Sequence, residues 1–350
     1  MAFTPPRCPH QDCERHSRPQ PGFCRRRGFY YPDCRAEGVQ RYFCKACRRT
    51  FSRQTFRFDY RDRRPLDNVP LFFHLISGSG MRQAGRVLGL DVRAVQQKQQ
   101  KMAAMLASLH GNLCQQLPSG RTWLLDEEET YEAASIRPLT MPVLIDKETW
   151  FVVATAVGPI RRLAPAGTAR RERQRRDEAK RGRRPDHSSR CVRQVLQKLA
   201  RLVAEGSVLL HTDQKASYAT IARSVLGSRL EHVTTAGTLV RNTHNPLFAI
   251  NVTLAMTRDN CGRLRRKSWL VTKLAERLQD HLALFTVYRN YVRRRFNRDG
   301  ERETAGAMLG LLPRQLRRAE VLAWRQDWGA RSIHPMCQDG SRTVRDAVAA

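Results

Sequence analysis

The sequence of 350 residues contains no apolar run long enough to cross a membrane. A spanning helix needs roughly 18 or more consecutive apolar residues, and no stretch of the chain approaches that length. The first residues, Met-Ala-Phe-Thr-Pro-Pro-Arg, lack the apolar segment of a secretory signal. A basic protein that acts at a membrane is therefore disfavoured, and we expect a cytoplasmic protein.

Acidic residues are also scarce. Lys and Arg number 63 against 32 Asp and Glu, which gives a net charge of +31. A charge of this size and sign indicates a polyanionic partner. The length allows two or three domains, and a hydrophobic content of 41% is enough for ordinary cores. We therefore expect a multidomain protein that binds nucleic acid.

Cysteine is concentrated at one end of the chain. Six of the ten cysteines lie in the first 47 residues: Cys8, Cys13, Cys24, Cys34, Cys44 and Cys47. Clustering without a secretory signal favours a metal site over disulfides. The Cys44-Lys-Ala-Cys47 knuckle supplies one pair of ligands, and Cys8 and Cys13 are the favoured second pair because Pro9 follows Cys8. Residues 1–60 are thus predicted to form a zinc ribbon that contacts DNA or RNA.

Other ligand sets remain open for this zinc. Cys24, Cys34 and His10 are possible substitutes, and six free structural cysteines are the alternative interpretation. If Zn²⁺ is bound, it contributes on the order of 10 kcal/mol to the folding of a segment too small to fold by itself.

Residues 61–115 are predicted to form a helix-turn-helix. Helices are expected over 68–76, 81–88 and 92–101, with Asp91 as the N-cap of the third. The expected inner face consists of Ala84, Val87, Leu88, Leu90 and Val95. The outer face of the third helix offers Arg93, Gln96, Gln97, Lys98 and Gln100 to base edges or phosphates. A plain helical hairpin is the alternative.

From residue 120 the pattern changes to strands. Apolar, β-rich runs occupy 122–126, 139–145, 150–157 and 208–213, and helices are expected over 192–203, 215–225 and much of 245–291. Between them, residues 161–184 hold 11 Arg and Lys against 3 Asp and Glu, and we expect a solvated loop that is disordered without a partner. Residues 301–350 are expected to be a helical extension with a flexible tail.

Two of these strands end in an acid, Asp126 after the first and Asp213 after the fourth. Three strands, a helix, a strand and more helices match the order of an RNase H-like core over residues 120–300. That topology places strands one and four side by side, so the two carboxylates would hold Mg²⁺ or Mn²⁺ for phosphodiester chemistry. The alternative is that each Asp is an ordinary turn residue. The predicted fold class is therefore multidomain α+β and α/β: zinc ribbon, helix-turn-helix, and an RNase H-like mixed-sheet core with a helical C-terminal part.

The chain resembles bacterial insertion-sequence transposases of the DDE type that carry an N-terminal zinc ribbon and helix-turn-helix. The resemblance covers nearly all of residues 8–335. The segments that carry it, in order, are Arg-Thr-Phe-Ser at 49–52, Asp126-Glu-Glu-Glu-Thr-Tyr-Glu132, Thr212-Asp213, Asn245-Pro-Leu-Phe-Ala-Ile-Asn251, Leu254-Ala-Met-Thr-Arg-Asp-Asn260, Arg263-Leu-Arg-Arg-Lys-Ser-Trp269 and Tyr288-Arg-Asn-Tyr291. It implies an enzyme that cuts and joins DNA at element ends, with Asp126 and Asp213 as metal ligands.

The third metal ligand departs from the family. Such transposases usually place a Glu on the helix after the last strand, and the spacing of Arg258 and Arg263 puts that position near Asn251. Asp259 and Glu276 are the nearest acidic replacements, and Glu127 and Glu129 can assist from the first strand. Basic residues beside this site are expected on one helix region, where they would clamp DNA phosphates: Arg258, Arg263, Arg265, Arg266 and Lys267.

The resemblance also implies partners. We expect double-stranded DNA, both the terminal repeats of an element and a target, a homodimer or larger assembly, and a nucleoid-associated location in the bacterial cytoplasm. One alternative is a catalytically inactive, transposase-derived DNA-binding protein. A second, an RNA-directed RNase H-like nuclease, is disfavoured because a helix-turn-helix has little use in the narrow major groove of RNA.

Overall fold

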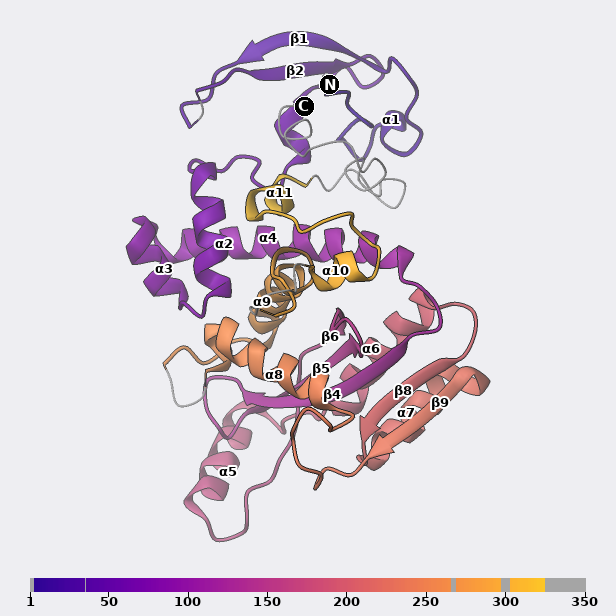
Figure 1. Cartoon of the computed structure of the whole chain (residues 1–350). Coiled ribbons are helices and arrows are strands. Elements are labelled where there is room, and N and C mark those ends of the chain that lie inside the picture. Colours follow the sequence, from indigo (N-terminus) through magenta and orange to yellow (C-terminus); the bar gives the residue numbers. More distant parts are fainter. Residues whose placement is uncertain (1–2, 35, 266–268, 297–302, 325–350) are drawn as a thin grey trace.

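The computed structural model describes residues 3–34, 36–265, 269–296 and 303–324. Figure 1 shows three tiers: a small sheet at the top, a helical layer in the middle, and a larger sheet with its own helices below. The protein is therefore of mixed α and β structure. None of the described helices combines the length and apolarity needed to cross a membrane.

The small sheet belongs to the cysteine-rich segment. Its strands are β1 (Cys24–Tyr30), β2 (Val39–Cys44) and β3 (Thr50–Ser52), which pair antiparallel in that order; helix α1 (Glu14–Ser17) precedes them. Aromatic rings fill the space beneath the sheet, with Tyr42 and Phe51 stacked at 5.6 Å between centroids. Because so small a core contributes little to the free energy of folding, the segment needs a second source of stability.

The helical layer consists of α2 (Asn68–Ile76), α3 (Met81–Leu88) and α4 (Val92–Leu113). The first two have the predicted bounds, whereas α4 continues twelve residues beyond the predicted end at 101. The Asp91 side chain accepts a hydrogen bond from the Arg93 N–H, so the predicted N-cap is confirmed. Ala84 and Val95 are buried as predicted, but Val87 is 67% exposed, and its placement on the inner face was wrong.

The larger sheet has the strand order β6-β5-β4-β8-β9, with β7 paired to β5. Its strands are β4 (Thr122–Tyr131), β5 (Pro138–Asp146), β6 (Val152–Thr155), β7 (Gly158–Pro159), β8 (Val208–Asp213) and β9 (Leu230–Thr235). Strands β4, β5 and β6 pair antiparallel, while β8 runs parallel to both β4 and β9. Within the predicted run 150–157 the strand is shorter, Val152–Thr155, and β7 begins after the run. The partly exposed edge strand β9 was not anticipated.

Helices cover both faces of this sheet. On one face α6 (Ser188–Leu202) and α7 (Ala216–Leu226) share a core with the helical layer, and Trp123 and Leu125 of β4 point into it. On the other face α8 (Phe248–Asn260) packs on Leu124 together with part of α9 (Ala275–Val287), which also contacts α4. Alternate residues of β4 therefore face opposite cores.

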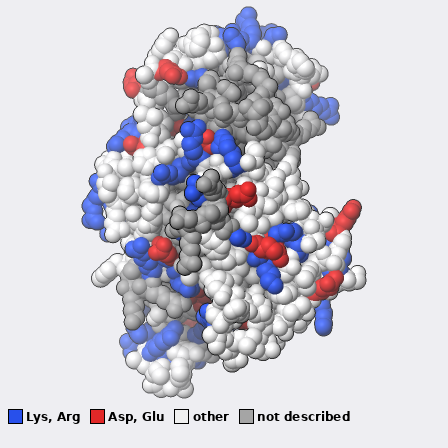
Figure 2. Space-filling model, viewed as in Figure 1, with Lys and Arg blue, Asp and Glu red and all other residues white. Residues whose placement is uncertain are grey.

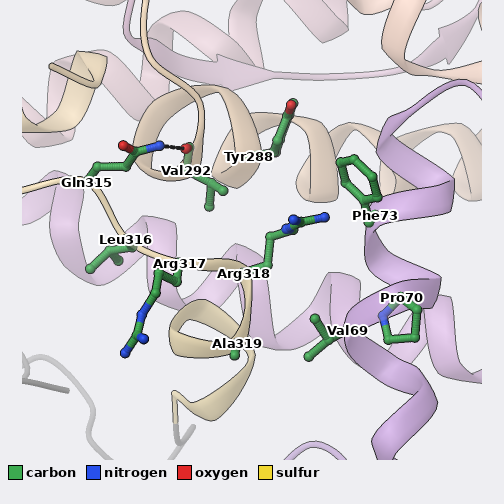
Figure 3. A pocket seen from close by; sticks show the side chains of 10 residues that line it. All are labelled: Val69, Pro70, Phe73, Tyr288, Val292, Gln315, Leu316, Arg317, Arg318 and Ala319. Atoms are coloured by element: carbon green, nitrogen blue, oxygen red, sulfur yellow. Dashed lines mark hydrogen bonds between the residues drawn. The ribbon is translucent and has the colours of Figure 1, made fainter. Parts of the chain in front are cut away.

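The C-terminal part leans on the helical layer. A π-helical turn (Tyr288–Val292) continues α9, and α10 (Ala305–Met308) and α11 (Arg318–Ala323) follow. Figure 3 shows the shallow groove that residues 315–319 form with α2: the Arg318 guanidinium lies 3.9 Å from the Phe73 ring centroid. Short 3-10 turns occur at Arg53–Phe56, Pro65–Asp67, Cys114–Gln116, Gly227–Arg229 and Gly262–Leu264. The predicted flexible tail after residue 330 lies outside the described residues.

The disordered loop predicted for residues 161–184 is wrong. Residues Ala169–Arg181 form helix α5, which projects from the end of the larger sheet at the lower left of Figure 1. Thr168 caps its start by accepting a hydrogen bond from the Arg171 N–H. Charge density alone gave the loop prediction, whereas the helix is held by ion pairs with residues far away in the sequence.

Candidate metal centres and nucleic-acid surface

Four cysteines in the upper tier form a metal-binding cluster. The Sγ atoms of Cys8, Cys13, Cys44 and Cys47 all lie within 4.8 Å of one another. The Cys8–Cys47 and Cys13–Cys44 pairs are 3.7 and 3.8 Å apart. Zn–S bonds of about 2.3 Å in a tetrahedron give S–S edges of about 3.8 Å, so the cluster fits a structural metal such as zinc. The favoured ligand set is the one that the fold brings together.

Two tight turns produce this arrangement. Cys44 ends β2, and a turn closed by the Arg48 N–H to Cys44 carbonyl bond carries Cys47 back to the same point. The Cys13 N–H bonds to the His10 carbonyl and bends the first loop toward them. Cys24 pairs with Cys44 across the strands and Cys34 is half-buried, but neither joins the cluster, and neither does His10.

The thiols differ in acidity. Burial raises the pKa of Cys8 and Cys13. At Cys47 burial acts in the same direction, but hydrogen bonds from the Arg49 backbone and guanidinium outweigh it and lower the pKa to about 7. A thiolate is the form that binds metal, so Cys47 is prepared for this role near neutral pH.

Asp126 and Asp213 lie on adjacent parallel strands. The pairing of β4 with β8 matches Thr122 to Leu209 and Leu124 to His211. Two residues further along both strands this register gives Asp126 and Asp213. Side chains alternate along a strand, so Asp126 lies on the same face as Leu124, toward α8. The fold thus brings the two predicted carboxylates to one place.

Their electrostatics show how close they are. Burial together with the charges of Asp213 and Glu127 raises the pKa of Asp126 to about 6, although the Glu127 N–H and the charge of Arg241 act against the shift. The Asp126 carboxylate accepts a hydrogen bond of 2.7 Å from the Glu127 N–H, and that of Asp213 accepts one of 3.0 Å from the Lys215 N–H. Within the described residues neither carboxylate is in an ion pair. A pair of uncompensated carboxylates is a site that a divalent cation fits.

Glu127 supports this site from the opposite face of β4. Its buried carboxylate is ion-paired with Lys215 and accepts hydrogen bonds from Tyr218, Ser188 and Thr140. The expectation that Glu127 assists as a metal ligand is therefore wrong, because its side chain points away from Asp126. The alternation of side chains along a strand predicts from the sequence alone that Glu127 faces away from Asp126.

Asn251 lies on the surface of α8 that faces β4. The helix packs on β4, and Arg258 near its end is ion-paired with Glu128 of that strand. Asn251 precedes Arg258 by seven residues, or about two turns, so the two side chains share one face of the helix. The third-ligand role of Asn251 remains a prediction that this placement permits.

The acidic replacements lie elsewhere. Asp259 is exposed, and because it directly follows Arg258 its side chain points from a different face of α8. Glu276 is exposed on α9 and paired with Arg277, and Glu129 is paired with Arg162. Among the described residues the cysteine cluster is the only set of three or more possible metal ligands, so no third acid joins Asp126 and Asp213.

The residues of α4 that were predicted to contact DNA differ in exposure. On α4, Arg93 and Gln97 are exposed and Gln96 is half-buried. Lys98, however, is only 7% exposed, and its ammonium group contacts Asp62, Asn68 and the Arg64 carbonyl. Its assignment to the outer face was wrong because its anionic partner lies 36 residues earlier, beyond the reach of a local pattern.

The basic residues after α8 do not share one helix, contrary to expectation. The helix ends at Asn260 and a 3-10 turn follows. Arg263 is half-buried between α3 and α4, where it contacts Met81 and Gln99, and burial lowers its pKa. Arg258 is ion-paired, Arg265 is exposed, and Arg266 and Lys267 lie outside the described residues.

Basic groups nevertheless lie at many separate points of the surface (Figure 2). Figure 2 shows Lys and Arg on all three tiers of the viewed face, with acidic groups among them. Arg241, exposed in the segment before α8, is near enough to Asp126 to lower its pKa, and sequence reasoning did not single it out. Comparison of the chain with family models and with curated proteins finds no match in either.

Proposed function

We propose that the protein is a DNA transposase of the DDE type, which binds the terminal repeats of an insertion element and catalyses metal-dependent cleavage and strand transfer. The observation that carries the proposal is the position of Asp126 beside Asp213 on adjacent parallel strands, with the pKa of Asp126 raised to about 6. Carboxylate pairs in such a setting are common at phosphoryl-transfer sites.

The sheet topology supports an RNase H-like core. Three antiparallel strands come first in the chain, and two parallel strands extend the sheet beyond β4. This order matches the one expected from the sequence. A zinc-stabilised small sheet and an exposed α4 surface with Arg93 and Gln97 supply two further elements suited to duplex DNA.

The residues present fit Mg²⁺ or Mn²⁺. Asp126 and Asp213 would hold the ions, and the Asn251 amide oxygen would add a neutral ligand. The chemistry supplied at such a site is activation of an attacking oxygen and stabilisation of the leaving one. The protein's own part is to hold the carboxylates in place through the Glu127 and Lys215 amides. Arg241 is placed to contact a phosphate near them.

A specific observation favours a second candidate, a catalytically inactive protein that still binds element ends. Asn251 carries no charge, and no third acid lies with the pair among the described residues. Fewer charged ligands weaken the binding of divalent ions. The two candidates share the same DNA-binding surfaces and differ in catalysis alone.

A cleavage assay tests the proposal. Wild type, Asp126→Ala and the matched control Glu129→Gln are incubated with Mg²⁺ or Mn²⁺ and DNA bearing terminal repeats. Glu129 lies on the same strand but is exposed and paired with Arg162. We expect nicking and strand transfer from wild type and Glu129→Gln, and none from Asp126→Ala. Tight binding without cleavage by any of the three would support the inactive candidate instead.

A further inference from the structure

Residues 161–187 form a folded basic arm at the end of the larger sheet. Its helix α5 is fastened by Arg137, which pairs with Asp177 at 3.2 Å, and by Arg161, which pairs with Glu178 at 2.8 Å. The buried Gln174 amide accepts a hydrogen bond from the Ala164 N–H and donates one to the Arg162 carbonyl. The arm is therefore a fixed part of the molecule.

All three acids of the helix are in ion pairs. Asp177 and Glu178 are paired with the arginines that anchor the arm, and Glu172 is paired with Arg176 at 3.1 Å. The helix also has seven basic residues: Arg170, Arg171, Arg173, Arg175, Arg176, Lys180 and Arg181. An ordinary solvated helix interleaves both signs on its outer face, whereas here two of the three acids, Asp177 and Glu178, are paired with the anchoring arginines and Glu172 is the one exposed acid.

The outer face presents a stripe of three basic side chains. Arg173, Arg176 and Lys180 lie opposite Gln174, and all three are exposed. A rise of 1.5 Å per residue separates them by about 4.5 and 6 Å along the axis. Neither Arg173 nor Lys180 is in an ion pair with any described residue, and the Arg176–Glu172 pair is exposed and therefore weak. The stripe is free to meet an external anion.

The base of the arm is joined to the chain segment that carries Asp126. Arg137 and Arg184, which join the arm to the sheet, both pair with Glu132, six residues beyond Asp126 on the chain of β4. Six strand residues span about 20 Å. Duplex DNA rises about 3.4 Å per base pair, so the separation of Asp126 from the base of the arm corresponds to about six base pairs.

We propose that the basic arm binds the phosphate backbone of duplex DNA through Arg173, Arg176 and Lys180, on the same duplex that reaches Asp126 and Asp213. The choice of duplex DNA rests on the proposed function. The contact is independent of base sequence, because arginine and lysine on a rigid helix meet phosphates without entering a groove.

The experiment measures binding of a labelled mixed-sequence DNA duplex by fluorescence anisotropy over a series of salt concentrations in buffer without Mg²⁺, Mn²⁺ or chelator. The variant Arg173→Gln/Arg176→Gln/Lys180→Gln is compared with Arg193→Gln/Arg201→Gln/Arg223→Gln. The control removes the same charge from exposed positions on α6 and α7, on the face of the sheet away from Asp126. Gln keeps the helix propensity in both, and thermal unfolding verifies that both are folded.

We expect the arm variant to reduce the log–log salt slope by up to about 2.7, or 0.9 for each of three phosphates. The control should leave the slope nearly unchanged. Equal salt slopes for the arm variant and the control would overturn the proposal. A slope that the arm variant reduces with an RNA duplex but not with a DNA duplex would overturn it as well. Binding without Mg²⁺ or Mn²⁺ needs no catalysis, so an arm-dependent slope in a protein that never cuts DNA would refute the transposase proposal and leave the role of the arm intact.

Discussion

Glu127 and Lys215 form an ion pair beneath the two carboxylates of the candidate catalytic site. The backbone N–H of Glu127 holds Asp126, and that of Lys215 holds Asp213. One side-chain contact on the far face of the sheet therefore ties together the two segments whose amides position the acids. Tyr218 and Ser188 add hydrogen bonds to the same carboxylate.

Removing one partner should loosen both segments. Lys215→Met leaves the Glu127 carboxylate, 6% exposed, without its counter-ion, and we expect a loss of about 3 kcal/mol in the free energy of unfolding. Urea denaturation measures it. Arg162→Gln, which breaks the exposed pair with Glu129, should cost less than about 1 kcal/mol. Similar losses in the two variants would show that the Glu127–Lys215 pair has no special role.

The raised pKa of Asp126 predicts a pH-dependent stability. The folded protein keeps the proton on Asp126 up to about pH 6, whereas the unfolded chain releases it near the ordinary aspartate pKa of 3.8. The folded state thus binds more protons between these values, and its stability falls as the pH rises through them. Raising the pKa of Asp126 from 3.8 to about 6 corresponds to a change of about 3 kcal/mol in the free energy of unfolding.

Asp126→Asn removes this titration. We expect the variant to be more stable than wild type at pH 8, by up to about 3 kcal/mol, and to match it more closely at pH 4. Denaturant unfolding at the two pH values gives both differences. Added Mg²⁺ should narrow the gap at pH 8, because a cation favours the ionised carboxylate. A gap that does not change with pH would mean that Asp126 titrates normally in the folded protein.

Metal should hold the upper tier together. Extraction with a chelator is expected to unfold residues 1–60 and leave the larger sheet folded, since structural zinc supplies about 10 kcal/mol or more to such modules. Zinc content and circular dichroism report the two effects. Cys44→Ser should lose the metal, whereas Cys24→Ser should retain it, because Cys24 is outside the cluster. Loss of zinc from both variants would contradict the ligand assignment.

Local signals predicted much of this structure. The bounds of α2 and α3, the Asp91 cap and four strands of the larger sheet, β4, β5, β6 and β8, follow from apolar periodicity and capping residues within a few positions of each other. The four cysteines of the cluster were predicted from the Cys44–Cys47 knuckle and from Pro9 after Cys8. Lys98 and the basic arm could not be predicted in this way, because Asp62 and Arg137, their partners, lie 36 and 40 residues away.

Lys98 and Arg93 should behave differently although both were expected to touch DNA. Lys98→Met leaves Asp62 with Lys101 alone, and should destabilise the helical layer by about 3 kcal/mol. Arg93→Ala, at an exposed position, should leave stability within about 0.5 kcal/mol. Anisotropy with duplex DNA should then show weaker binding for Arg93→Ala. Weaker binding by a fully stable Lys98→Met protein would restore Lys98 to the DNA surface.

Asn251 decides between the active and inactive candidates. Asn251→Glu would add a charged ligand on the face of α8 that also carries Arg258. We expect Mn²⁺ affinity, measured by calorimetry, to rise at least tenfold, since each added carboxylate strengthens a site for hard cations. If wild type binds DNA without cutting it, the variant should gain cleavage. Asn251→Ala is the control and should gain neither. An unchanged Mn²⁺ affinity in Asn251→Glu would place residue 251 away from the carboxylate pair and remove it from the site.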